Sequence, residues 1–177
     1  PDHRTLPVTL ALSPKDLSDA EVDRRIASIK RLSALPLSLS ADTAKAVDPF
    51  LEKLAAAVIE KHQAGTTIVI LNRVNRARDL FDLLGKLAKK HSLPEGILVH
   101  SRFRPMERVR LSKQLKEPGE KIIVATQAIE AGVDISARAL ITELAPWSSL
   151  VQRFGRCNRK GEFNDTGGAD IFWIDLA

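Results

Sequence analysis

Short runs of apolar residues, rich in β-branched side chains, recur along the second two thirds of the chain. They lie at residues 67–71, 96–99, 121–125, 140–142 and 171–174. Hydrophobicity within each run is continuous rather than alternating, which is typical of strands covered on both faces. The stretches between them have helical periodicity. The pattern predicts an α/β fold with a parallel sheet, crossover helices and both faces covered.

Two of the intervening stretches predict amphipathic helices. The first spans residues 48–62, and its apolar side carries Phe50, Leu51, Leu54, Val58 and Ile59. The second spans residues 77–90, and its inward side carries Leu80, Leu83, Leu84 and Leu87. Charged residues fill the opposite side of the second helix, as expected where one side faces solvent.

The first forty residues follow a different pattern. Residues 8–12 predict a strand, and Ser18 or Asp19 is a suitable cap for a helix that carries Val22, Ile26 and Ile29. Residues 35–39 predict an edge strand, because a proline cannot donate a ladder hydrogen bond. We therefore divide the chain into a leading segment or family-specific insertion, residues 1–44, and a main domain unit, residues 45–177.

Composition narrows the class of protein. The 177 residues fit one domain with a real core, and the net charge of +5 favours a polyanionic partner, although many basic domains bind no nucleic acid. Cys157 is the only cysteine, which excludes an internal disulfide and favours a reducing, cytoplasmic location. No run is long and apolar enough to span a membrane. Because the chain begins at Pro1, we expect it to be part of a longer protein.

Polar and basic side chains follow several of the predicted strands. Ligands of open α/β sheets collect beyond the carboxyl ends of the strands, so these loops could present one rim to a phosphate backbone. The alternative is that the loop arginines only cover helix ends and solvate the surface. The residues concerned are Asn72, Arg73, Asn75, Arg76, Arg78, His100, Ser101, Arg102, Phe103, Arg104, Thr126, Gln127, Glu143, Pro146 and Trp147.

Two arginines, Arg156 and Arg159, stand three residues apart behind Gly155. A guanidinium stays charged and offers a fork of donors that suits a phosphoryl group in transfer. If both lie on one helical turn they can point toward one triphosphate. The spacing indicates one half of a nucleotide-driven motor. The alternative is that they pair with local acids such as Glu130 or Asp134 and only lock the fold.

These segments resemble the motifs of superfamily 2 helicases. Residues 123–134 resemble motif V, residues 152–159 motif VI and residues 67–73 motif IV, so the likeness covers roughly residues 45–175. It implies a RecA-like domain of P-loop NTPase type, the second of the two helicase domains, without a Walker A loop. The segments 100–103, 145–153 and 156–162 are similar more narrowly to the helicase–nuclease of type I CRISPR systems. DEAD-box proteins usually have Thr-Gly where this chain has Cys157-Asn158.

The resemblance also implies roles for single residues. Arg159 would be the arginine finger at the γ-phosphate of ATP, and Arg156 would support it. Nucleotide contacts would come from Gln152, Gly132 and Asp134. Contacts to the tracked strand would come from Thr126, with Arg73, Ser101 and Arg102 as weaker candidates.

Cofactors and partners follow from the same resemblance. ATP and Mg²⁺ would be held mainly by a first RecA-like domain, because this sequence has neither a G-x-x-x-x-G-K-[ST] loop nor a D-E-x-H box. Single-stranded DNA and a CRISPR surveillance complex would be the other partners, and a divalent metal would belong to a linked nuclease rather than to this chain. We expect the isolated chain to be inactive. Alternatives are a superfamily 2 RNA or DNA helicase outside CRISPR, or a non-catalytic nucleic-acid-binding module.

Other candidate residues have simpler interpretations. A lone histidine such as His100 is more often structural than a ligand, and the histidines lack ligand spacing, so no metal site is predicted. Trp147 could stack on a base or anchor the core. Cys157 is best interpreted as a small packed residue. Phe172 and Trp173 are predicted core residues.

Overall fold

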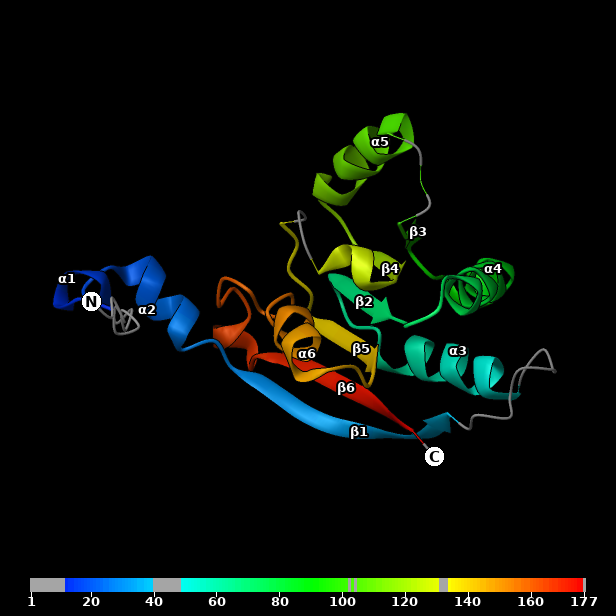
Figure 1. Ribbon diagram of the computed structural model, residues 1–177, viewed down its shortest axis with the longest axis horizontal. Coiled ribbons are helices and arrows are strands. Elements are labelled where there is room, and N and C mark those ends of the chain that lie inside the picture. Colours follow the sequence, from blue (N-terminus) through cyan, green and yellow to red (C-terminus); the bar gives the residue numbers. More distant parts are fainter. Residues whose placement is uncertain (1–11, 40–48, 102, 104, 131–133, 177) are drawn as a thin grey trace, which may run out of the picture.

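The computed structural model describes residues 12–39, 49–101, 103, 105–130 and 134–176. They form a six-stranded sheet in the order β1-β6-β5-β2-β4-β3, and every neighbouring pair is parallel. The predicted α/β parallel fold is confirmed (Figure 1). The strands are β1 (Lys30–Leu39), β2 (Thr66–Ile70), β3 (Glu95–Val99), β4 (Lys121–Ala125), β5 (Ala139–Glu143) and β6 (Ala169–Leu176).

One face of the sheet is covered by α3 (Pro49–Lys61) and α4 (Val74–His91). Their apolar sides, including Leu54, Val58 and Leu80, pack against strand residues such as Val69 and Val124. Both helices were predicted from their periodicity, and both are confirmed. Phe172 packs against this same core, whereas Trp173 is only half-buried.

The other face is covered by α5 (Pro105–Lys116), the 3₁₀ turn η1 (Gln127–Ile129) and the end of α6 (Trp147–Phe154). The sequence pattern did not predict α5. Its apolar signal is weak because Leu111 and Leu115 pack inward while Met106 and Val109 are exposed to solvent. Helices therefore lie on both faces, as predicted.

The leading segment differs in part from its prediction. The strand expected at 8–12 lies outside the described residues except for Leu12, which is not in a strand. Asp19 does cap α2 (Ala20–Ile26), accepting hydrogen bonds from the amides of Glu21 and Val22. This helix follows the shorter α1 (Pro14–Leu17) and buries none of its residues, so the predicted apolar side is not packed and Ile29 lies beyond its end. Short, highly charged helices bury little surface.

The predicted edge strand is confirmed and is longer than expected. β1 runs beside β6 at the outer edge of the sheet, and their register shifts between Ala34 and Ser38, on either side of Pro36. A proline interrupts ladder hydrogen bonding, which an edge strand tolerates. The leading segment thus contributes a strand to the main sheet.

Candidate nucleotide and nucleic-acid interface

The carboxyl ends of β2, β4 and β3 are neighbours, because these strands are adjacent in the sheet. Arg73 follows β2 and is exposed at the start of α4, Thr126 follows β4, and Ser101 is exposed after β3. The predicted common rim is therefore present. Arg102 lies outside the described residues.

Thr126 is the buried member of this rim. Its amide donates to the carbonyl oxygen of Val99 over 3.0 Å, which fixes the residue between β4 and β3. Its hydroxyl is buried and has no hydrogen-bond partner among the described residues. A buried hydroxyl without a partner carries a desolvation cost, which a ligand oxygen could relieve.

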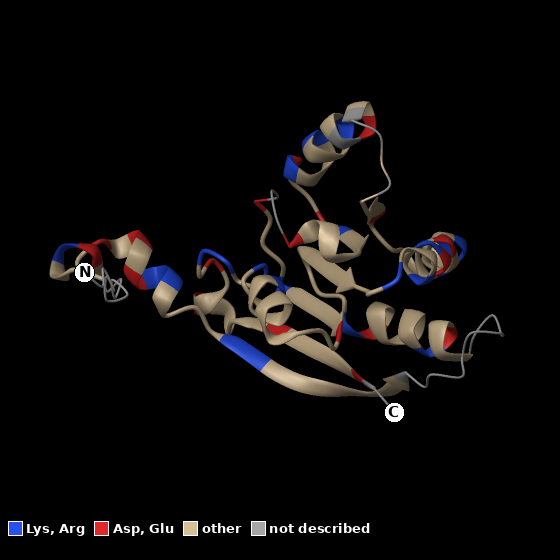
Figure 2. Cartoon of the chain, in the orientation of Figure 1, with Lys and Arg blue, Asp and Glu red and all other residues tan. Residues whose placement is uncertain are grey.

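A hollow opens at the same edge of the sheet. Its lining combines the polar residues Asn72, Gln127, Ser149 and Arg153 with the apolar residues Leu144, Ala145 and Pro146. Basic side chains are also frequent on the helices that start from this edge, and Figure 2 shows them in blue along α4 and α5.

Arg153 is a structural centre that the sequence did not reveal. The side chain is buried, and its Nε donates to Glu130 Oε1 over 2.8 Å. Its Nη1 donates to Thr142 Oγ1 and to the carbonyl oxygen of Glu143 at 2.9 and 3.0 Å. Its Nη2 donates to Asn72 Oδ1 over 3.0 Å. One guanidinium thus joins the ends of β2 and β5 to the segment after β4. Its partners are distant in sequence, so no local signal predicted the role.

A buried acid, Glu143, lies beside Arg153. Glu143 is fully buried, forms an ion pair with Arg76 and accepts a hydrogen bond from the amide of Asn72 over 2.6 Å. Buried carboxylates are retained only when paired and hydrogen-bonded, as this one is. The rim is therefore rigid where it meets α4.

Arg156 is also buried, with 6% of its surface exposed. Its Nη2 donates to the carbonyl oxygen of Glu130 over 2.7 Å. Burial, followed by repulsion from Arg159, lowers the pKa of Arg156. The side chain is thus held against the segment that leads from Thr126 toward Asp134.

Arg159 is the exposed arginine of the three. Its side chain is 41% exposed, and its Nε lies 3.1 Å from Oδ1 of Asp134, which is itself 60% exposed. Lys160 approaches the other oxygen of that carboxylate at 3.7 Å. The local pairing considered as an alternative therefore exists, but it is an open pair. Exposed pairs contribute little to stability and can exchange for another anion.

The two candidate arginines do not share a helical turn, so that expectation was wrong. Helix α6 ends at Phe154, and Asn158 adopts a left-handed conformation with φ 45°. The turn between Arg156 and Arg159 leaves the first guanidinium buried and the second at the surface.

The remaining predicted residues have mixed positions. Gln152 is exposed on α6, and Gly132 lies outside the described residues. Trp147 is 73% exposed, so it is not a core anchor. Cys157 is fully buried, and burial raises the pKa of its thiol to about 12, which agrees with a packed residue. His100 stacks on Phe103 with ring centroids 4.1 Å apart.

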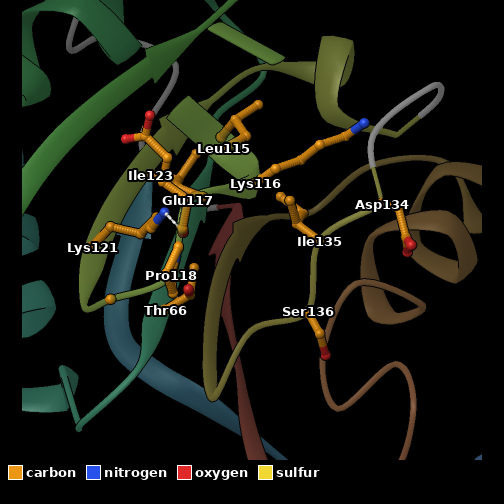
Figure 3. Close-up of a pocket in the computed structure, with 11 residues that line it drawn as sticks. Thr66, Leu115, Lys116, Glu117, Pro118, Lys121, Ile123, Asp134, Ile135 and Ser136 are labelled. Carbon is orange, nitrogen blue, oxygen red and sulfur yellow. Dashed lines mark hydrogen bonds between the residues drawn. The ribbon is translucent and has the colours of Figure 1, made fainter. Parts of the chain in front are cut away.

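A different hollow lies at the amino edge of the sheet, between the end of α5 and the segment 134–136 (Figure 3). Lys121 is buried beside it, and its Nζ donates to the carbonyl oxygens of Glu117 and Gln114 at 2.5 and 3.1 Å. These carbonyls belong to the last turn of α5 and the residue after it. Lys121 thus caps the helix, which is a structural role.

Within the described ranges, no group of three or more His, Cys, Asp or Glu side chains could hold a metal ion. None of the helices in those ranges is long and apolar enough to cross a membrane.

An all-parallel sheet in this order, with helices on both faces, is the arrangement of a RecA-like domain. Residues 63–162 match the family described as "CRISPR-associated nuclease/helicase Cas3, C-terminal", and the chain belongs to this family.

Similar proteins agree with this assignment. The CRISPR-associated nuclease/helicase Cas3 of Haloferax volcanii is 35% identical over 121 residues, which cover 63% of this chain and 12% of the relative. A putative protein of the same description from Methanocaldococcus jannaschii is 34% identical over 120 residues, covering 63% of this chain and 16% of the relative. The chain therefore spans a small part of the length of these relatives.

Solved structures show the same fold. The structure of T. fusca Cas3 with ATP superposes with a TM-score of 0.66 and 23% identity, covering 84% of this chain and 18% of that one. The C-terminal domain of the DEAD-box protein Dbp5 superposes with a TM-score of 0.54 and 21% identity, covering 78% of this chain and 76% of that domain.

Proposed function

We propose that this chain is the second motor domain of an ATP-dependent CRISPR-associated DNA helicase–nuclease that translocates on single-stranded DNA. The observation that carries the proposal is the state of Arg159. Its guanidinium is exposed and pairs with an exposed carboxylate, that of Asp134, whereas the side chains of Arg153 and Arg156 are buried. An arginine whose backbone is held by the fold and whose guanidinium is exposed can complete a phosphate site on a neighbouring domain.

In this proposal Arg159 is the arginine finger, and it exchanges Asp134 for the terminal phosphoryl group of ATP when the domains close. Arg156 supports Arg159 indirectly, because its buried side chain fixes the backbone of Glu130. Asp134, Gln152 and Gly132 would contribute to the nucleotide side of the cleft. ATP and Mg²⁺ would be bound mainly by the first RecA-like domain, which would supply the phosphate loop absent from this sequence.

The strand of DNA would cross the carboxyl rim of the sheet. The buried Thr126 hydroxyl would donate to a phosphate oxygen, and Arg73, Ser101 and Arg102 would add contacts that need no base readout. Glu130 lies between this rim and Asp134 in the chain and binds both Arg153 and Arg156. Through Glu130, a change at the γ-phosphate of ATP would alter the contacts to the DNA phosphates, and binding of DNA would alter the contacts to ATP.

The whole protein would act with further partners. A solved structure described as a CRISPR RNA-guided surveillance complex in its pre-nicking state contains a chain that superposes with a TM-score of 0.59. We infer that the protein containing this domain is recruited by such a complex. A divalent metal would serve a linked nuclease outside this chain, and the 177 residues alone would neither hydrolyse ATP nor cut DNA.

The test is Arg159→Ala in the intact protein with its first RecA-like domain. DNA-stimulated ATP hydrolysis should fall roughly a thousandfold, because an arginine finger contributes on that scale. Affinity for single-stranded DNA should stay the same. Lys160→Ala is the matched control, since it removes another cation beside Asp134 and should retain near-normal hydrolysis. Unchanged hydrolysis in Arg159→Ala would favour the non-catalytic module instead.

A further inference from the structure

The loop that carries Arg159, residues 155–161, is held from two sides. On one side it pairs with the segment after Asp134. The amide of Ala137 donates to the carbonyl oxygen of Arg156 at 2.8 Å, and the amide of Asn158 donates to that of Ala137 at 3.0 Å. The amide of Arg159 donates to Ser136 Oγ at 2.8 Å. This side fixes the loop to the sheet.

The other side is the junction between α2 and β1, residues 24–30. Arg24 Nε donates to the carbonyl oxygen of Gly161 over 3.1 Å, and Lys30 Nζ donates to that of Phe154 over 3.2 Å. The approach is close at Gly161, where φ is +69° and an added Cβ would meet the Arg24 carbonyl oxygen at 2.3 Å. Only glycine fits there.

Asn158 joins the two sides. It is fully buried, and its Nδ2 donates to the carbonyl oxygen of Ile29 and to Asn164 Oδ1, both at 2.9 Å. Its Oδ1 accepts from the amide of Phe163 at 3.0 Å. These hydrogen bonds hold Asn158 in a left-handed conformation, with φ 45°, which asparagine adopts more readily than most residues.

We propose that Asn158 and the α2–β1 junction position Arg159 for catalysis. The inference rests on the proposed finger role of Arg159. The left-handed turn at Asn158 directs the next side chain out of the fold toward Asp134, and the junction keeps that turn in place. Asn158 is a positioning residue, because its side chain is fully buried and bonded within the fold, and it would act through Arg159. A finger displaced by about 1 Å would lose much of its effect on the transition state.

The first variant is Asn158→Asp in the intact protein, which keeps the acceptor oxygen and a side chain that tolerates the turn but removes both donated hydrogen bonds. The turnover number for ATP should fall about 10- to 100-fold, with KM for ATP and affinity for DNA unchanged. Affinity for ADP–aluminium fluoride should fall by a similar factor, while affinity for ADP stays the same. A merely structural role would lower the melting temperature and leave the affinity of the folded protein for this transition-state mimic unchanged.

Two further comparisons guard against misfolding and separate the hypotheses. Arg24→Ala removes a contact of the junction with the loop without substituting a loop residue, and it should also lower the turnover number for ATP. Arg25 is an exposed neighbour paired with Glu21, and Arg25→Ala should leave the turnover number unchanged. In an Arg159→Ala background, Asn158→Asp should cause no further loss. An additive loss, or normal turnover in both Asn158→Asp and Arg24→Ala, overturns the positioning role. Normal ATP hydrolysis in the Arg159→Ala variant would instead overturn the finger role.

Discussion

Within one short stretch, Arg153, Arg156 and Arg159 occupy three different environments. Arg153 is buried and donates to β5 and to the segments after β2 and β4. Arg156 is buried and donates to the carbonyl oxygen of Glu130, whereas Arg159 is exposed. Chemically identical side chains therefore divide between holding the fold and, in the proposed function, meeting a ligand. The division follows from the end of α6 at Phe154 and the reversed turn at Asn158.

Arg153→Ala should strongly destabilise the domain. The substitution leaves Glu130 without this ion pair and removes the charged donor to the buried Thr142 hydroxyl and to the carbonyl oxygen of Glu143. Removing one partner of a buried ion pair costs about 3–5 kcal/mol. Chemical denaturation would measure the free energy of unfolding. Asp165→Asn, in the exposed pair with Arg24, serves as control and should change it by less than about 1 kcal/mol. An equally small effect at Arg153 would contradict the role.

At this scale motif spacing selected candidate residues, but their environments could not be predicted from the sequence, and their roles stay predictions. Motif spacing selected Thr126, Asp134, Arg156 and Arg159, and the structure places these residues near the rim or the exposed pair. The role of Arg153 could not be predicted, because its partners come from β5 and from loops far apart in sequence. The turn at Asn158 had a signal that was available: DEAD-box proteins have glycine there, and glycine and asparagine are the residues that best tolerate this conformation.

The elements follow from the sequence wherever apolar residues are continuous or periodic. The predicted strand at 121–125 coincides with β4, and the one at 67–71 is displaced by one residue from β2. Helix α5 was missed because much of its surface is charged and its apolar residues do not all face inward. It is held instead by Leu111, Leu115 and the Lys121 ammonium at its end.

Lys121→Met should loosen α5 selectively. Methionine keeps much of the volume, but the carbonyl oxygens of Gln114 and Glu117 lose their buried donor. An unsatisfied buried group costs about 1–3 kcal/mol. Hydrogen exchange should accelerate in the amides of α5 more than in those of α3. Lys113→Met on the exposed side of the same helix is the control. Equal exchange in both variants would show that the cap is unimportant.

Across the whole molecule, the rim at the carboxyl ends of the strands and the loop that carries Arg159, residues 155–161 (the arginine loop), lie at separate parts of the sheet. The rim is formed by the ends of β2, β4 and β3, and the loop follows α6 and packs beside β1. The sequence predicted that several polar loops could share a rim. It could not predict the strand order that makes this true, since the order depends on which crossovers are adjacent in space.

Binding of single-stranded DNA should weaken with salt. If Arg73 and Arg102 neutralise two phosphates, the slope of log K against log salt should be about −1.4, because single strands release about 0.7 counterion per contact. Arg73→Ala should make the slope shallower by about 0.7. Lys116→Ala, beside the hollow at the opposite edge, should leave it unchanged. Titration of fluorescent oligothymidine at several salt concentrations measures both slopes, and equal slopes for the two variants would place the strand elsewhere.

The pairing of β1 with β6 also constrains the order in which the chain can fold. Lys30 lies opposite Ala169, so the first strand has no neighbour until nearly the whole domain has been synthesised. Closing so long a loop is entropically costly, and contacts of this kind form late. During translation the central strands can assemble before β1 pairs with β6. The arginine loop, which packs against that strand's beginning, then acquires its final shape only in the last stage of folding.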